Sequence, residues 1–130
     1  MNIWTSLGNI HQIKIEIQIA ERQFELNRVE NDRQTVALKL YIYNNKIKEL
    51  QEAFKNMRKR GAVISLNEYE NMKVDYYFFK DKAADSKMYI DMLDAMILEL
   101  NKVIADLEIK REKLKTVVIE FKNVRSKNKK

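Results

Sequence analysis

The stretch R58-K-R-G-A-V-I-S-L-N-E68 decides the fold, because it places turn signals between two long apolar repeats. Gly61 can adopt the left-handed conformation that ends a helix, and the basic residues before it suit the negative end of the helix dipole. Ser65 and Glu68 then form the S-x-x-E capping box that starts a helix. The stretch therefore predicts that one helix ends before Gly61 and that a second begins near Leu66.

Apolar side chains recur at alternating steps of four and three residues on both sides of this turn. From Ile15 to Met57, eleven of thirteen such positions are apolar, and from Tyr69 to Arg125 fourteen of seventeen are. This spacing is typical of the seam of a coiled coil. The chain has no proline and only two glycines, so few residues would interrupt a long helix.

Two such seams joined by a short turn predict an all-α fold, a long antiparallel two-helix coiled-coil hairpin. We expect a single domain over residues 1–130, with helix 1 at about 9–60, a turn at about 61–65, helix 2 at about 66–124 and a basic tail at 125–130. Because the two helices run antiparallel from the turn, seam residues at equal distances from the turn should face each other in pairs. These pairs are Met57 with Tyr69, Leu50 with Tyr76, Ile47 with Phe79 and Ile19 with Leu107.

Arginines interrupt both seams. The same pairing places Arg33 near Leu93 and Arg111 near Ile15, and Arg22 lies in the seam of helix 1 as well. A two-helix seam is thin enough for an arginine to extend its guanidinium to water. We expect these arginines to fix the register of the hairpin rather than to carry chemistry.

The stretch I13-K-I-E-I-Q-I-A20 alternates apolar and polar residues, as a half-buried β-strand would. The first seam runs through it at Ile15 and Ile19, so we interpret it as helix. On a helix, Ile13 and Ile17 point about 160° to 200° away from those seam residues. They belong to a second stripe of apolar residues, made of Ile10, Ile13, Ile17, Ala20 and Phe24.

A hairpin offers helix 1 one partner helix, which covers the seam and leaves the second stripe uncovered. Three covers are open: an N-terminal segment with Ile3, Trp4 and Leu7 folded back, a partner protein, or a second copy of the chain. Five apolar side chains, at about 1.5 to 3 kcal/mol each when fully buried, are enough to anchor a partner. The second stripe is the strongest functional signal in the sequence.

Aromatic side chains form a second candidate surface at Y76-Y-F-F79. The two outer residues of this run belong to the seam, whereas Tyr77 and Phe78 lie off it and should be partly exposed. Exposed aromatic side chains are favoured anchors of protein interfaces. The alternative is a wider seam near the turn, which Tyr41 and Tyr43 would complete.

The net charge of +6 is distributed unevenly. Basic residues exceed acidic ones by seven over 110–130 and by five over 35–64, whereas acidic residues exceed basic ones by five over 65–109. The basic C-terminus lacks interleaved aromatic residues, so any nucleic-acid binding would be non-specific and salt-sensitive, and a solvated helix end is the alternative. A basic cluster before the turn fits either the helix dipole or an acidic partner. It consists of Lys55, Arg58, Lys59 and Arg60.

The sequence shows no catalytic, cofactor-binding or metal-binding pattern. His11 is the single histidine, cysteine is absent, and no Gly-rich phosphate loop occurs. We therefore expect no enzymatic activity, no cofactor and no metal. No apolar run approaches the roughly 18 residues of a membrane span, so we expect no membrane insertion and a cytoplasmic location.

The chain resembles the FliJ/YscO family, the small stalk proteins of type III secretion and flagellar export. The resemblance lies in its size, in the basic antiparallel coiled coil over the whole chain, and in the stretch G61-A-V-I-S-L-N-E-Y69 that leads into regular Ile/Leu heptads. Proteins of this family are similar to the γ subunit of rotary ATPases. The resemblance implies a role in protein transport and virulence, in which the open end of the hairpin enters the pore of a hexameric secretion ATPase and the turn region contacts an export gate protein. Some members also bind secretion chaperones.

The resemblance assigns two sets of residues by their position in the hairpin. The ATPase-side set is Ile10, Ile13, Ile17, Ala20 and Phe24 with Lys113 and Lys115, and the gate-side set is Tyr69, Tyr77 and Phe78.

Two other hypotheses stay open. One is a self-associating coiled-coil scaffold or assembly factor, in which the second stripe forms a four-helix dimer. The other, which we rank lowest, is a nucleic-acid-associated coiled coil that uses the basic C-terminus.

Overall fold

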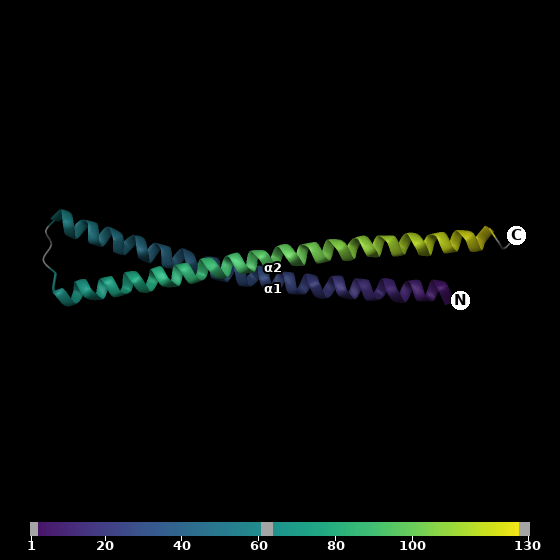
Figure 1. Cartoon of the computed structure of the whole chain (residues 1–130), viewed down its shortest axis with the longest axis horizontal. Helices are drawn as coiled ribbons and strands as arrows, with labels where there is room; N and C mark the ends of the chain where they lie inside the picture. Colours follow the sequence, from purple (N-terminus) through teal and green to yellow (C-terminus); the bar gives the residue numbers. More distant parts are fainter. Residues whose placement is uncertain (1–2, 61–63, 128–130) are drawn as a thin grey trace. The chain divides into compact units, whose positions relative to one another are not determined.

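The computed structural model describes residues 3–60 and 64–127 of the chain. It has two helices, α1 (Ile3–Arg60) and α2 (Leu66–Lys127), which pack against each other as an antiparallel hairpin (Figure 1). These ranges contain no strand, so the predicted all-α hairpin is confirmed. The alternating isoleucine stretch lies within α1 and is helical, as its seam residues predicted.

Both helices extend further toward the chain ends than the sequence predicted. α1 begins at Ile3 rather than near residue 9, and α2 continues to Lys127. Gly8 costs a helix about 1 kcal/mol relative to alanine, which is too little to stop it. Because the backbone is helical from Ile3, residues 3–8 extend α1 instead of folding back along it. Of the three possible covers of the second stripe, a folded-back N-terminal segment is therefore excluded. The predicted conformation of Gly61 lies outside the described residues.

The start of α2 is fixed by Ser65. The Ser65 hydroxyl oxygen Oγ accepts a hydrogen bond from the backbone N–H of Glu68 at 3.1 Å, and its carbonyl accepts one from the N–H of Tyr69 at 3.1 Å. Ser65 is thus the N-cap, because its hydroxyl satisfies a backbone donor that the first helical turn leaves without a partner. The predicted start of α2 at Leu66 is confirmed.

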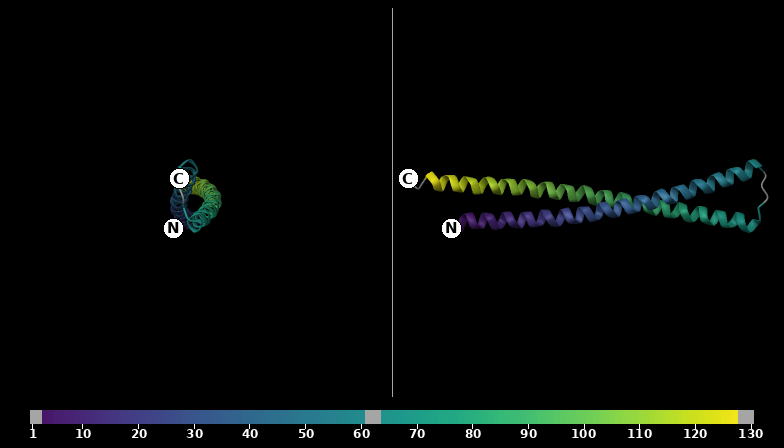
Figure 2. Two further views of the ribbon diagram at one scale, coloured as in Figure 1. Left: turned by 90° about the vertical axis from the view of Figure 1, so that its left-hand side faces the viewer. Right: turned by 180° about the vertical axis from the view of Figure 1, so that it is seen from behind.

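The chain forms two compact units, and each contains a segment of both helices. Unit 1 comprises residues 1–29 and 96–130, and unit 2 comprises residues 30–95. In unit 1, the beginning of α1 lies beside the end of α2 (Figures 1 and 2). Unit 2 contains the end of α1 and the first half of α2, which diverge from each other as they approach the turn (Figure 2).

The buried side chains that the structure describes all belong to the two predicted seams. Unit 1 buries four of them and unit 2 buries two, and none of the polar side chains whose burial the structure describes is buried. Two helices can shield a residue from water only along the line where they meet, so positions off the seam stay exposed. The buried residues are Ile19, Val29, Leu100 and Ile104 in unit 1, and Ala83 and Leu93 in unit 2.

Aromatic contacts between the helices of unit 2 agree with the predicted pairing to within about one helical turn. The ring of Phe54 lies 5.9 Å from that of Tyr69, and the ring of Tyr43 lies 6.2 Å from that of Phe79, measured between centroids. The prediction paired each of these α2 residues with a neighbouring seam residue of α1. Pairing at equal distance from the turn therefore predicts the register of unit 2 to within about one helical turn.

Two of the seam arginines form ion pairs of different kinds. In unit 2, Arg33 of α1 donates from Nε to Oδ1 of Asp94 and from Nη2 to Oδ2 at 3.4 Å, beside Leu93 as the register predicted. These hydrogen bonds, and then the carboxylate charge, raise the pKa of Arg33. In unit 1, Arg22 pairs at 3.1 Å with Glu25 of its own helix. Among the ion pairs of the described residues, the Arg33 pair is the one that joins two helices, so it supports one register.

Candidate protein-interaction surfaces

One face of α1 in unit 1 carries exposed apolar side chains. Ile13 is 54% exposed and Phe24 is 75% exposed, whereas Ile19 and Val29 of the same helix are buried. The contrast follows from helix geometry, since stripe and seam residues point in nearly opposite directions and α2 can cover only one of them. The second stripe is exposed at each of its positions, Ile10, Ile13, Ile17, Ala20 and Phe24.

The basic residues of the ATPase-side set lie on α2 of the same unit. Lys113 is exposed, while Lys115 is half-buried and its Nζ lies 3.5 Å from Oε1 of Glu112. The Nε of Arg111 lies 3.7 Å from the same oxygen. Two cations therefore share one carboxylate and keep a net positive charge, and Lys113 has no carboxylate within ion-pair distance in the described part of the chain.

The gate-side residues lie on the first turns of α2, in unit 2. Tyr77 is 59% exposed and Phe78 is 50% exposed, as their positions off the seam predicted. Each ring packs edge-on against that of its seam neighbour, Tyr77 against Tyr76 at 5.5 Å and Phe78 against Phe79 at 5.4 Å. The two rings are therefore held in place yet remain accessible to a partner.

The alternative prediction was that Tyr41 and Tyr43 widen the seam near these aromatic residues. Only one of the two tyrosines contributes to the seam. The ring of Tyr43 packs against Phe79 of α2 and is half-buried. Tyr41, the other residue expected to widen the seam, is exposed. The seam thus gains no cover for Tyr77 and Phe78 from Tyr41.

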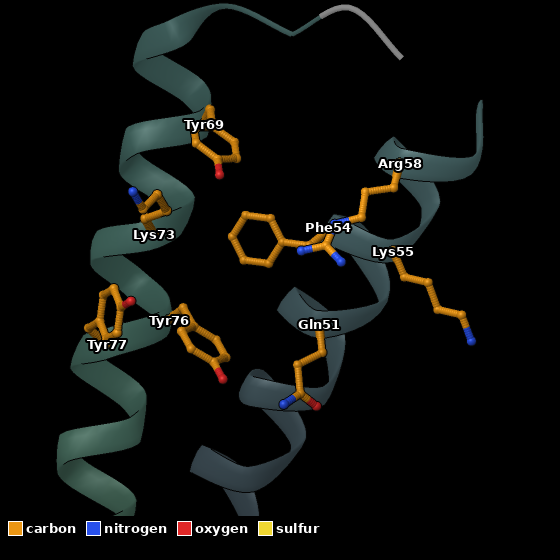
Figure 3. Close-up of a pocket in the computed structure, with 8 residues that line it drawn as sticks. All are labelled: Gln51, Phe54, Lys55, Arg58, Tyr69, Lys73, Tyr76 and Tyr77. Carbon is orange, nitrogen blue, oxygen red and sulfur yellow. The ribbon is translucent and has the colours of Figure 1, made fainter. Parts of the chain in front are cut away.

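The seam of unit 2 does not close near the turn. Tyr69 occupies a seam position but is 39% exposed. Phe54 of α1 stands between the rings of Tyr69 and Tyr76, at centroid distances of 5.9 and 6.2 Å and interplanar angles of 81° and 86° (Figure 3). Rings packed edge-on in this way keep the two backbones apart. The seam therefore opens into a cavity.

We call this cavity the turn groove. Its volume is about 580 Å³, and both helices of unit 2 contribute to its walls. It is within the size range of pockets that bind small molecules or side chains of a partner. The turn groove is lined by Gln51, Phe54, Lys55 and Arg58 from α1 and by Tyr69, Lys73, Tyr76 and Tyr77 from α2 (Figure 3).

The charged residues that line the turn groove are all basic. They are Lys55, Arg58 and Lys73, and none of them forms an ion pair in the described ranges. The Nζ of Lys73 lies 5.6 Å from the centroid of the Tyr69 ring, within the distance of a cation–π interaction. The turn groove therefore combines aromatic walls with positive charge.

Tyr76 shows the effect of this environment on a titratable group. Its pKa is lowered, because the side chain of Gln51 and then that of Lys80 form hydrogen bonds with the phenol. Lys80 also lies 5.2 Å from the centroid of the Tyr76 ring. The surroundings of the phenol thus favour negative charge.

Sequence reasoning identified part of this groove. The basic cluster contained Lys55 and Arg58, and the gate-side set contained Tyr69 and Tyr77. Lys73 was missed because it lies in an acidic segment and off the seam, where its direction depends on how far the helices diverge. Gln51 could have been found, since the predicted pairing put its neighbour Leu50 opposite Tyr76.

The described part of the chain contains neither a helix that could span a membrane nor a cluster of metal-binding side chains. Neither α1 nor α2 contains a segment that is both long and apolar enough to cross a membrane. Within the same residues, no group of three or more His, Asp or Glu side chains is placed to hold a metal ion.

Comparison with known proteins gave no relative of this chain. No protein-family model matches it, and no match was found among curated protein sequences or among solved structures. The candidate binding surfaces of the chain are the second stripe of unit 1 and the aromatic and basic residues of unit 2.

Proposed function

We propose that this protein is a non-catalytic central stalk of a type III secretion export apparatus, which links the hexameric secretion ATPase to the export gate. The second stripe carries this proposal. Its five residues are exposed on a face of α1 that α2 cannot cover. Removing such apolar surface from water is favourable by about 25 cal/mol per Å², so a partner helix or pore wall would bind there.

A stalk acts through contacts at two places and needs no reacting group. The second stripe, with Lys113 and Lys115, binds the ATPase from unit 1. The gate-side residues bind the export gate from unit 2, through the exposed rings of Tyr77 and Phe78. Secretion chaperones are a further class of partner.

The test is affinity capture of the tagged chain from its own host, with the bound proteins identified by mass spectrometry. The variant Ile13→Lys/Ile17→Lys places two charges in the second stripe. The matched control is Leu98→Lys/Ile109→Lys, which makes the same chemical change at two exposed apolar residues of α2 in the same unit. Both variants add the same net charge, so a difference between them reports on the stripe.

We expect the wild-type chain and the control to recover a hexameric ATPase, and the stripe variant to lose it. Binding that needs apolar contact is abolished when charged groups must be buried without a partner. Equal recovery of the ATPase by the stripe variant and the wild-type chain would contradict this anchor. Recovery of no ATPase by the wild-type chain would contradict the stalk function itself.

The exposed stripe also supports a second candidate function, a self-associating scaffold. Two copies could bury their second stripes against each other and form a four-helix dimer. Light scattering at micromolar concentration distinguishes the two candidates. A dimeric mass that is lost in Ile13→Lys/Ile17→Lys but kept in Leu98→Lys/Ile109→Lys would favour the scaffold, whereas a monomeric mass of the wild-type chain would remove it.

A further inference from the structure

We propose that the turn groove binds a short acidic segment of a partner protein, which inserts one aromatic or aliphatic side chain between the aromatic walls. This assigns a partner chemistry to Tyr69 and Tyr77 of the gate-side set and to that extent rests on the proposed function. The binding itself requires neither an ATPase nor an export gate, so it can be tested alone.

The shape of the groove gives the size of the segment. From Gln51 to Arg58 the α1 wall is about 10 Å long, at 1.5 Å per residue. About three residues of an extended chain span that distance, at roughly 3.3 Å each. Phe54 stands between the rings of Tyr69 and Tyr76, and these rings offer edges and faces to an inserted side chain (Figure 3). The groove thus fits a short peptide better than a folded surface.

The charged residues that line the groove are basic, although acidic residues lie close by on both helices. The first turns of α2 hold the carboxylates of Glu68, Glu70 and Asp75, yet none of these lines the groove, whereas Lys73 does. On α1, Glu52 follows Gln51 but is also absent from the walls.

The guanidinium of Arg58 lies beside Phe54, whereas the side chains of Lys55 and Lys73 point away from the facing helix (Figure 3). The positive charge therefore lies mainly at the rim of the groove, where it complements a carboxylate-rich partner.

The helix dipole does not explain this arrangement. Lys55 and Arg58 lie near the C-terminal end of α1, where a cation is stabilised by the dipole. Lys73 is the eighth residue of α2, about two turns from its N-terminal end, where the dipole has little effect on a side chain. The ammonium group of Lys73 lies 5.6 Å from the centroid of the Tyr69 ring of its own helix, and its positive charge also remains available to an anionic partner.

A nucleic acid fits the groove less well than a peptide. A phosphate backbone carries charge along its whole length and would extend beyond a groove about 10 Å long. On the α2 side it would then meet Glu68, Glu70 and Asp75, which are exposed. A compact acidic segment with a single apolar side chain needs only the groove.

The test measures binding of a fluorescein-labelled peptide, Glu-Glu-Phe-Glu-Glu, to the full chain by fluorescence anisotropy. Two further labelled probes accompany it, a peptide with alanine in place of phenylalanine and a single-stranded oligonucleotide of the same net charge. We expect the phenylalanine peptide to bind more tightly than both. Tighter binding of the oligonucleotide, or equal binding of the two peptides, would overturn the proposal.

A matched pair of variants locates the site. Arg58→Glu/Lys73→Glu reverses two cations of the groove, while Lys59→Glu/Lys87→Glu reverses two exposed lysines that do not line it. The net charge changes equally in both. Exposed ion pairs are each worth up to about fivefold in affinity, and reversed charges add repulsion, so we expect binding about tenfold weaker in the first variant and little changed in the second. Equal weakening in both variants would show non-specific attraction and overturn the proposal.

A measurement on the unaltered chain covers the case in which the groove variant misfolds. In a titration followed by nuclear magnetic resonance, the peptide should shift the backbone resonances of residues 51–58 and 69–77 and leave those of unit 1 in place. Shifts confined to other residues would overturn the proposal. A peptide-binding groove would stand even if the chain captures no secretion ATPase, so the two proposals can fail separately.

Discussion

Units 1 and 2 are built from the same two helices but close their seams in different ways. Unit 1 buries aliphatic side chains from both helices, with Val29 only 2% exposed. Unit 2 buries Ala83 and Leu93 further from the turn, but its seam becomes aromatic near the turn, where Tyr69 stays 39% exposed. The same heptad spacing thus gives a closed seam or an open groove, depending on whether the side chains interdigitate or stand edge-on.

The two units also offer partners different chemistry. Unit 1 exposes a stripe of apolar residues on the outer face of one helix, and binding there depends on burial of apolar surface. Unit 2 exposes a groove between two helices with aromatic walls and three cations, and binding there depends on charge as well. Substitutions in each unit test whether this contrast is real.

The largest expected effect is at the closed seam of unit 1. Leu100→Ala should lower the free energy of unfolding by about 2 to 4 kcal/mol, because it removes a buried side chain and leaves a cavity. Urea unfolding followed by circular dichroism measures the change. The control Leu98→Ala alters an exposed leucine of the same helix and should stay within about 0.5 kcal/mol. Similar losses in both variants would mean that the seam is not closed.

A smaller effect is expected at the open seam of unit 2. Phe54→Ala removes two edge-on ring contacts from a half-buried position and should cost about 1 to 2 kcal/mol in the same unfolding experiment. The loss should be less than that of Leu100→Ala. A loss as large as in unit 1 would show that Phe54 lies in a packed core and that the difference between the two seams is smaller than described.

Loss of the N-cap of α2 should destabilise unit 2 and leave unit 1 unchanged, because Ser65 lies in unit 2. Ser65→Ala removes the oxygen that accepts from the N–H of Glu68 and should cost about 1 kcal/mol. Hydrogen exchange should become faster in the first turn of α2 and stay unchanged in unit 1. Ser65→Asp retains an acceptor and should behave like the wild-type chain, and unchanged exchange in Ser65→Ala would contradict the role of the cap.

The smallest effect on stability is expected from the variant with the largest effect on the proposed function. Ile13→Lys/Ile17→Lys alters exposed residues and should change the free energy of unfolding by less than about 0.5 kcal/mol. Ile19→Lys, in the seam of the same helix, should be strongly destabilising because it buries an unpaired charge. Unfolding of the double variant would show that the stripe is internal.

The hairpin and its two seams could be predicted from the sequence because each depends on spacing along one helix. The six residues that are buried in the described part of the chain all lie on the predicted seams, and the pairing across the turn agrees to within about one helical turn. The end of α1 nearest the chain terminus could not be placed as well. The sequence predicted that helix 1 begins at about residue 9, whereas the backbone is helical from Ile3.

The candidate surfaces were predictable to different degrees. The second stripe followed from the angle between Ile13 and Ile15 on a helix, and its exposure is confirmed. The ion pair of Arg33 was located only to the neighbourhood of Leu93, since spacing alone does not say which flanking side chain reaches across to it. For the turn groove, the sequence indicated several of its residues but not that they share a cavity.

The sequence by itself determined the two helices, the N-cap at Ser65 and the faces of α1, because these depend on hydrogen bonds and angles between residues close in the chain. Only the tertiary structure decided where the seam stays open and which charges line the opening. Those features depend on the sizes of side chains that meet from two helices, such as Phe54, Tyr69 and Tyr76, and on the distance at which these side chains hold the helices apart.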